Sequence, residues 1–181
     1  MRTPFFITIF LFLTEISFAQ LPKKVMKKMG QNPSLFLDSV ETNMSTLQTL
    51  NPFDISNVSV VKRKKAKKLI GNKGADGAVY VTTIKAARKI YWKFFSTKSD
   101  EYRELVPSPQ ADTIVQYVLN GQPLTDTSAP GNLLLINEKN FKSLEIIDKE
   151  KILSDNVKPR RYVVAIKARR PKGLIKTSNS K

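Results

Sequence analysis

The sequence contains no cysteine and no histidine among its 181 residues. Without cysteine the chain forms no disulfide bond and carries no lipid on a cysteine, so its stability has to come from an apolar core. Without either residue it lacks the commonest general base, the thiol nucleophile and most transition-metal ligands. No spacing of the remaining serines, lysines and carboxylates selects a catalytic pair. We therefore predict a protein that is not an enzyme and that uses no cofactor or metal.

Long apolar runs are confined to the beginning of the sequence. Arg2 supplies a positive charge, an apolar run extends from Phe5 to Leu13, and Ser17-Phe18-Ala19 places small residues where a signal peptidase reads them. This pattern predicts a signal peptide over residues 1–19. The run is too short for a membrane-spanning helix, which needs about 20 apolar residues, and no later run approaches that length. We expect an exported protein of the periplasm or the outer-membrane surface, with no transmembrane segment after signal removal.

Acidic residues are scarce as well. The chain has 15 acidic and 31 basic residues, which gives a formal net charge of +16. Such a balance predicts an anionic partner. Nucleic acid is the usual partner of a strongly basic protein, but an exported chain meets the anionic lipid and polysaccharide of the envelope instead. We therefore expect no nucleic acid, and expect either those envelope components or another protein as the partner.

One stretch of the sequence occurs nearly twice. Tyr80 to Arg88 reads YVTTIKAAR, and Tyr162 to Arg169 reads YVVAIKAR. A β-rich run precedes each copy, at Ile55–Lys62 and at Phe141–Asp148. This repeat predicts an α+β fold with two small modules of mixed β-strands and short helices, at residues 34–88 and 113–170, packed together.

The segments outside the modules have distinct compositions. In residues 20–33, apolar side chains recur at Leu21, Val25 and Met29 among lysines. This spacing predicts a short basic amphipathic helix that lies either on the edge of a sheet or on a membrane surface. Residues 171–181 are polar and basic, which predicts a disordered tail.

Residues 89–112 join the modules and are rich in aromatic side chains, at Tyr91, Trp92, Phe94 and Phe95. Aromatic residues bury the most area per residue, so we favour a linker that packs in a core between the two modules. The alternative is a contact surface for sugar or lipid.

Local patterns predict the elements of the modules. In the first, Asp54 is expected to cap a single helical turn, and residues 62–69 are expected to form a helix that buries a stripe of Ala66, Leu69 and Ile70. A closing strand should run from residue 78 to 84. In the second, a strand over 114–119 should end at the turn dipeptide Asn120-Gly121.

The predicted helix is the strongest candidate for a binding surface. Positive charges crowd together there and would be relieved by an anionic partner. The alternative is a solvated helix face without a partner. Further cations would extend the surface if the two closing strands were neighbours: Arg160, Arg161, Arg169, Arg170 and Lys172. The residues of this surface are Lys62, Arg63, Lys64, Lys65, Lys67 and Lys68.

Two smaller motifs complete the candidate sites. Gly71, Gly74 and Gly77 match no phosphate-binding pattern and precede a predicted strand, so they are interpreted as a structural turn with positive φ. Ser39 and Thr113 lie in Asp-Ser-Val and Asp-Thr-Ile triplets, which are similar to an O-glycosylation signal of exported Bacteroidetes proteins.

Residues 35–85 resemble a known domain. The similar segments are FLDSVE at 36–41, LNPFDI at 50–55, VSVVK at 58–62 and GNKGADGAVYVTT at 71–83. Together they resemble the plug domain of TonB-dependent outer-membrane receptors, and in particular the starch-utilisation-type transporters of Bacteroidetes. Val118–Pro123 looks like the opening of a second such module.

The resemblance implies a protein-interaction module at the outer membrane. No barrel-length segment follows the second module in this sequence, so we expect no transport activity. The helix in the family is small and mostly uncharged, whereas here it carries six cations, which would not sit dry inside a barrel. Two alternatives remain: a binder of anionic lipid or polysaccharide through the basic helix, and a degenerate receptor remnant without activity.

Overall fold

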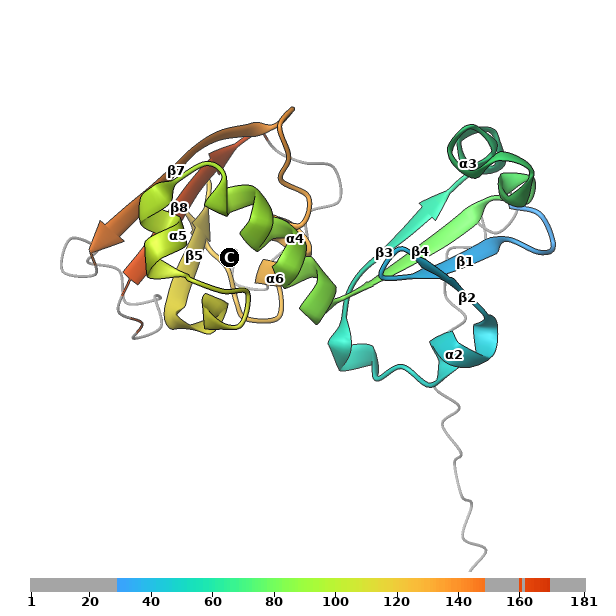
Figure 1. Cartoon of the computed structure of the whole chain (residues 1–181), viewed down its shortest axis with the longest axis horizontal. Helices are drawn as coiled ribbons and strands as arrows, with labels where there is room; N and C mark the ends of the chain where they lie inside the picture. Colours follow the sequence, from blue (N-terminus) through green and yellow to red (C-terminus); the bar gives the residue numbers. More distant parts are fainter. Residues whose placement is uncertain (1–28, 149–159, 161, 170–181) are drawn as a thin grey trace, which may run out of the picture.

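The computed structural model describes residues 29–148, 160 and 162–169. These residues form two lobes that lie side by side (Figure 1). Each lobe contains one four-stranded sheet with parallel and antiparallel neighbours. The predicted α+β class is confirmed. Within the described ranges, no helix is long and apolar enough to span a membrane.

The first lobe, residues 29–83, is built on a sheet of order β2-β1-β4-β3. The central strands β1 and β4 are parallel, and the two outer strands pair antiparallel to them. Its elements are β1 (Ser34–Leu37), β2 (Val40–Thr42), α2 (Met44–Gln48), the 3-10 turn η1 (Pro52–Asp54), β3 (Ile55–Val61), α3 (Arg63–Ile70), the 3-10 turn η2 (Gly71–Gly74) and β4 (Ala78–Thr83).

The second lobe, which comprises the described residues from 84 onward, repeats this topology with the order β6-β5-β8-β7. Helices α4 and α5 cover one face of its sheet (Figure 1). Its elements are α4 (Ile84–Ser96), α5 (Asp100–Leu105), the 3-10 turn η3 (Ala111–Ile114), β5 (Val115–Leu119), β6 (Gln122–Pro123), α6 (Ala129–Leu133), β7 (Phe141–Asp148) and β8 (Tyr162–Ala168).

The duplication extends to individual hydrogen bonds. Asp38 follows β1, its backbone N–H donates to Val81 O at 2.9 Å, and its carboxylate accepts from Thr83 N at 2.7 Å. Asn120 follows β5 in the same way: its N–H donates to Ile166 O at 2.8 Å, and its amide oxygen accepts from Ala168 N at 2.9 Å. In both lobes, therefore, a turn residue fixes the end of the closing strand.

The structural alignment of the two closing strands is shifted by three residues from the alignment of the repeated sequence. In space Val81 corresponds to Ile166, whereas the matching letters place Val81 opposite Val163. The predicted strand 78–84 is also too long, because Thr83 ends the strand and its hydroxyl accepts from Ala86 N at 3.1 Å to cap α4. The residues after Thr83 are helical in the first copy and extended in the second.

The aromatic segment does not pack between the two sheets as predicted. Tyr91 and Phe95 of α4 and Tyr102 of α5 are almost completely buried, and they belong to the core of the second lobe together with residues of β5 and β8. These side chains recur with helical spacing on one face of α4, which explains why that face packs on the second sheet. The first lobe has a smaller core, formed by Met29, Leu47, Val79 and Val81.

Two local predictions are wrong. Asp54 does not cap its turn, because the Asn51 side chain accepts the hydrogen bond from Phe53 N at 3.0 Å. Leu69 does not join the buried stripe of α3, since it is 59% exposed.

The predicted signal peptide, the disordered tail and most of residues 20–33 lie outside the described residues. Within residues 20–33, Met29 is described, and it packs in the core of the first lobe.

Candidate functional site

Helix α3 exposes nearly all of its side chains. Ala66 is fully buried, Ile70 is half-buried, and all six cations of the predicted surface are exposed. Arg63 nevertheless has a structural contact, because its guanidinium donates to Met29 O at 2.7 Å. We define the basic surface as the five lysines of this helix region, which have no carboxylate partner among the described residues: Lys62, Lys64, Lys65, Lys67 and Lys68.

The glycine turn holds α3 against the sheet. Gly71 and Gly77 have φ values of 63° and 91°, as the interpretation of a structural turn requires. Gly74 does not have a positive φ. It is needed for a different reason, since a Cβ atom at this position would lie 2.3 Å from the backbone carbon of Ala66. The turn therefore brings its own backbone into contact with the backbone of α3.

The charges on α3 are unfavourable for the free helix. Like charges four residues apart, as in Lys64 and Lys68, cost about 0.2–0.5 kcal/mol per pair. The first turn carries cations and no acidic residue, so it also opposes the positive end of the helix dipole. Arg160 does not extend the surface, because β4 and β8 belong to different sheets and Arg160 binds Val115 O and Asp126 in the second lobe. An anionic partner would relieve the repulsion on α3.

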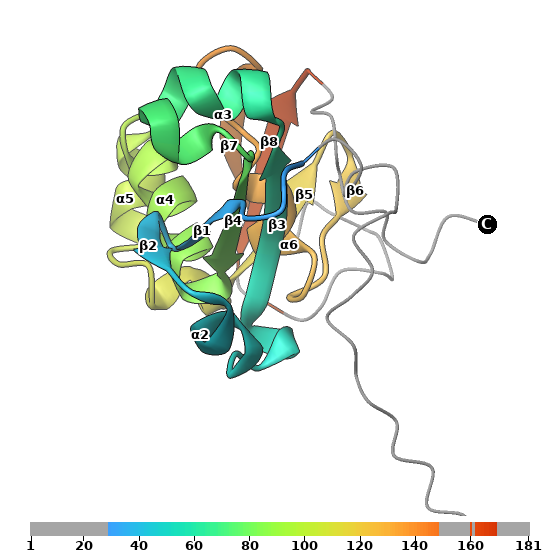
Figure 2. The same ribbon diagram turned by 90° about the vertical axis from the view of Figure 1, so that its right-hand side faces the viewer.

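The outer strand β3 leads directly into this helix. It lies at one edge of the first sheet, and Figure 2 shows α3 at its end. Its sequence ISNVSVV has no charge and no proline, which are the usual protections of an edge strand. Helices α4 and α6 contact β3. Ser56 is buried, whereas Val58 is 47% exposed and Ser59 is exposed. The middle of β3 is therefore exposed, and no described strand pairs with its outer edge.

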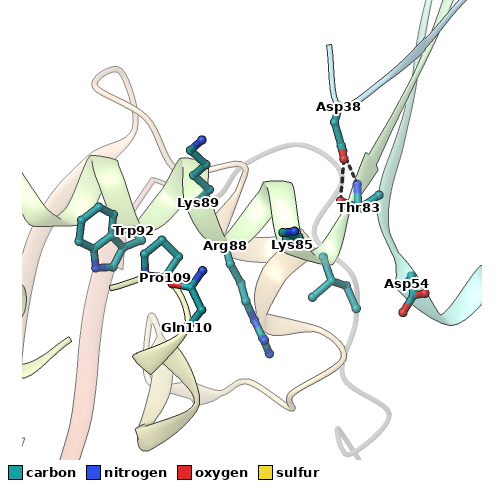
Figure 3. Close-up of a pocket in the computed structure, with 10 residues that line it drawn as sticks. Asp38, Asp54, Thr83, Lys85, Arg88, Lys89, Trp92, Pro109 and Gln110 are labelled. Atoms are coloured by element: carbon teal, nitrogen blue, oxygen red, sulfur yellow. Dashed lines mark hydrogen bonds between the residues drawn. The ribbon is translucent and has the colours of Figure 1, made fainter. Parts of the chain in front are cut away.

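A second feature is a cleft of about 940 Å³ at the start of α4 (Figure 3). One wall is a face of α4 that presents Lys85, Arg88, Lys89 and Trp92 at helical spacing. Figure 3 shows Trp92 beside Pro109 and Gln110, and two carboxylates from the first lobe also line the cleft. Those carboxylates are Asp38, which binds Thr83, and the exposed Asp54.

Behind this cleft lies a buried polar network. Asp112 accepts hydrogen bonds from the hydroxyls of Tyr91 and Tyr117, and the Tyr102 hydroxyl lies 2.8 Å from that of Tyr117. Arg88 Nε lies 3.4 Å from Asp112 Oδ2. Burial raises the pKa of the Asp112 carboxyl, and its hydrogen bonds to the two tyrosines act in the opposite direction.

This network has no room for a substrate. The void beside Arg88 and Asp112 measures about 10 Å³, which is space for one water molecule at most. Burial also raises the pKa of the Tyr91, Tyr102 and Tyr117 hydroxyls, so they stay protonated and donate hydrogen bonds. The network is suited to fixing α4 against β5.

Both glycosylation candidates are exposed, but their surroundings differ. Ser39 lies in the two-residue turn between β1 and β2 with a φ of 73°, and the following Val40 is 69% exposed. Thr113 lies in η3 directly after the buried Asp112. Only the Ser39 triplet stands clear of the core. Modification at either position stays a prediction.

The sequence interpretation did not identify the cleft. It ended the closing strand at residue 84, predicted no helix over residues 85–88 and placed Trp92 in a linker, so the helical spacing of Lys85, Arg88 and Trp92 was not recognised. The helical spacing of these residues was the feature of the sequence that could have identified this wall of the cleft. In the part of the chain that the structure describes, no cluster of three or more acidic side chains could hold a metal ion.

Comparison with known proteins does not assign the chain to a family. No family model, no curated protein and no solved structure matches it.

Proposed function

We propose that the chain is a non-catalytic, exported envelope protein that binds another envelope protein through its first lobe. One observation carries the proposal: an uncharged edge strand, exposed at its middle, continues directly into an exposed basic helix. The partner segment we infer is an extended strand that pairs with β3, followed by acidic residues that meet the basic surface. The resemblance of residues 35–85 to receptor plug domains supports a place at the outer membrane.

The two surfaces supply different parts of the binding. Strand addition to β3 provides main-chain hydrogen bonds, with the exposed Val58 available to pack against a side chain of the partner. The lysines of α3 provide attraction over distance and charge-assisted contacts. Leu69 is exposed among these lysines, which favours a partner that combines acidic with apolar side chains over a purely anionic one.

The second edge strand offers a matched control. Glu145 of β7 is the structural equivalent of Ser59 of β3. Glu145 pairs with Ala165 of β8, and Ser59 pairs with Tyr80 of β4. Ala165 and Tyr80 occupy the same position in the two closing strands, because each directly precedes the residue whose carbonyl accepts from the turn residue. β7 also carries the charged Lys142 and Glu145, which protect an edge strand. We therefore expect a partner at β3 and none at β7.

The test places a photo-cross-linking amino acid at Ser59 or at Glu145 and irradiates intact cells of the source organism. The proposal predicts that one outer-membrane or periplasmic protein is captured from Ser59, with cross-links that map to an extended segment, and is not captured from Glu145. Equal capture from both positions would contradict it. No captured protein under any condition would favour the degenerate remnant.

Binding of anionic lipid or polysaccharide is the second candidate, because five exposed lysines lack carboxylate partners in the described part of the chain. Changing Lys64, Lys65, Lys67 and Lys68 to Gln separates the two. Electrostatic binding at exposed sites is screened over about 8–10 Å near physiological ionic strength. A lipid or glycan binder would thus lose envelope retention in this variant and at raised salt, whereas strand pairing would persist at a reduced level.

A further inference from the structure

The cleft at the start of α4 combines groups that the proposed protein interaction does not use. Its α4 wall carries three cations and one indole ring, and its other walls offer an amide and two carboxylates. We propose that this cleft is a binding site for a short acidic oligosaccharide. The site is separate from the basic surface of α3 and does not depend on the proposed function.

The cations indicate the acidic group of the ligand. Lys85 and Lys89 are exposed one turn apart on α4, and Arg88 lies between them in the sequence. The Arg88 Nε is buried beside Asp112 without a hydrogen bond, and the side chain is 29% exposed. Its remaining donors have no hydrogen-bond acceptor among the described residues, so they are available to a carboxylate, which a guanidinium binds in a bidentate manner.

The ring of Trp92 indicates a sugar rather than a simple anion. The indole N–H donates to Val106 O at 2.7 Å, which fixes the ring in place before any ligand binds. Pro109 lies beside it and widens the apolar platform (Figure 3). A pyranose ring has an apolar face that packs on such a platform, and an aromatic ring buries much area at little entropic cost.

The acceptor groups account for the hydroxyls of a sugar. Asp54 and Gln110 are exposed at the cleft, and their oxygens accept hydrogen bonds from hydroxyl groups. Two carboxylates would oppose a ligand that is only a compact polyanion. A sugar acid places its charge on one side and its hydroxyls around the ring, which suits a lining of both signs. The volume of about 940 Å³ is in the range of small-molecule sites, about 300–1,000 Å³.

The chain contains a single tryptophan, so the fluorescence of Trp92 reports on this cleft alone. The experiment titrates the purified full chain with trigalacturonate at fixed ionic strength. We expect a saturable change in tryptophan emission. Maltotriose, which has as many rings and no charge, should bind at least about tenfold more weakly, because it lacks the charge-assisted hydrogen bonds.

Two controls separate the site from general attraction to a basic protein. Citrate carries three carboxylates and no ring, and it should produce no comparable change. The variant Lys85→Gln/Lys89→Gln should weaken trigalacturonate binding about tenfold. The matched variant Lys64→Gln/Lys65→Gln removes the same charge from α3 and should leave the affinity unchanged. Glutamine has a helix propensity close to that of lysine, so both variants keep their helices.

Three results would overturn the inference. The first is an unchanged emission with trigalacturonate, with no binding heat by calorimetry. The second is equal binding of citrate, which would show a site for any polyanion. The third is equal loss of affinity in the α3 variant, which would place the binding on the basic surface. None of these results bears on whether β3 pairs with a partner strand.

Discussion

Replacing Gly74 with alanine tests how the first lobe positions its basic helix. An added Cβ would lie 2.3 Å from the carbonyl carbon of Ala66, 2.5 Å from its oxygen and 2.6 Å from Lys67 N. Ordinary contact begins at 3.4 Å. The backbone of α3 must therefore move by about 1 Å relative to η2. Because backbone atoms are involved, no change of side-chain rotamer relieves the contact.

Forced overpacking of this kind typically costs about 1–3 kcal/mol. For a chain of this length, each kcal/mol lowers Tm by about 2–4 °C, so Gly74→Ala should lower Tm by roughly 2–12 °C. The assay is a thermal melt followed by circular dichroism. Hydrogen exchange should show the loss concentrated in α3 and β4, since the second lobe has its own core.

The double variant Gly74→Ala/Ala66→Gly provides the decisive comparison. Deleting the Ala66 side chain does not remove the backbone atoms that the new methyl group meets, so no stability should be regained. Recovery of stability in the double variant would show that the contact is with the side chain, and the reasoning would be refuted. The reasoning would also be refuted if Gly74→Ala alone lowered Tm by less than about 1 °C.

Three further predictions concern the same elements and the core behind the cleft. Gly77→Ala places a Cβ 3.0 Å from Val61 O at a φ of 91°, so urea unfolding should show a loss of about 1–3 kcal/mol. Tyr117→Phe removes a hydrogen bond to the buried Asp112 and should lower the free energy of unfolding by about 1–3 kcal/mol. The control is Tyr80→Phe, because the Tyr80 hydroxyl has no partner among the described residues. This variant should lose less than about 0.5 kcal/mol in the same assay. Burial raises the pKa of Tyr91, Tyr102 and Tyr117 above the unfolded value of about 10. The stability that these protonated hydroxyls contribute is complete below pH 10 and is lost as the pH rises further. Thermal melts should therefore show a steep fall in Tm above pH 10, and the fall should be shallower in Tyr117→Phe. A Tm that does not change with pH above 10 would contradict this.

The sequence predicted the fold class and the duplication because both depend on short-range patterns. Alternating apolar residues and the dipeptide Asn120-Gly121 are local signals, and the structure places strands and a hairpin turn there. The detailed alignment of the repeat was wrong because Thr83 ends β4 and caps α4. Nothing in the matching letters distinguishes a strand that continues from a strand that stops at a helix cap.

The candidate sites were predicted unevenly for the same reason. The basic surface is contiguous in sequence, so composition alone revealed it. The cleft brings Lys85 and Trp92 of α4 together with Pro109 and with Asp38 of the first lobe. Such a site requires the arrangement of two lobes, which no local pattern contains. Asp112 illustrates the limit: the sequence offered it as part of a glycosylation triplet, and the structure shows it buried among tyrosine hydroxyls.

The two lobes have diverged in how they use one topology. In the second lobe α4, α5 and α6 contribute large side chains to an extensive core, among them Tyr91, Tyr102 and Leu133. In the first lobe a smaller core supports a helix whose charges repel one another and an edge strand without protective charges. The repulsion within such a helix is unfavourable for the free protein, and binding of the proposed anionic partner would offset that cost. In the proposed function, the larger core of the second lobe would offset the cost of exposing these two surfaces on the first.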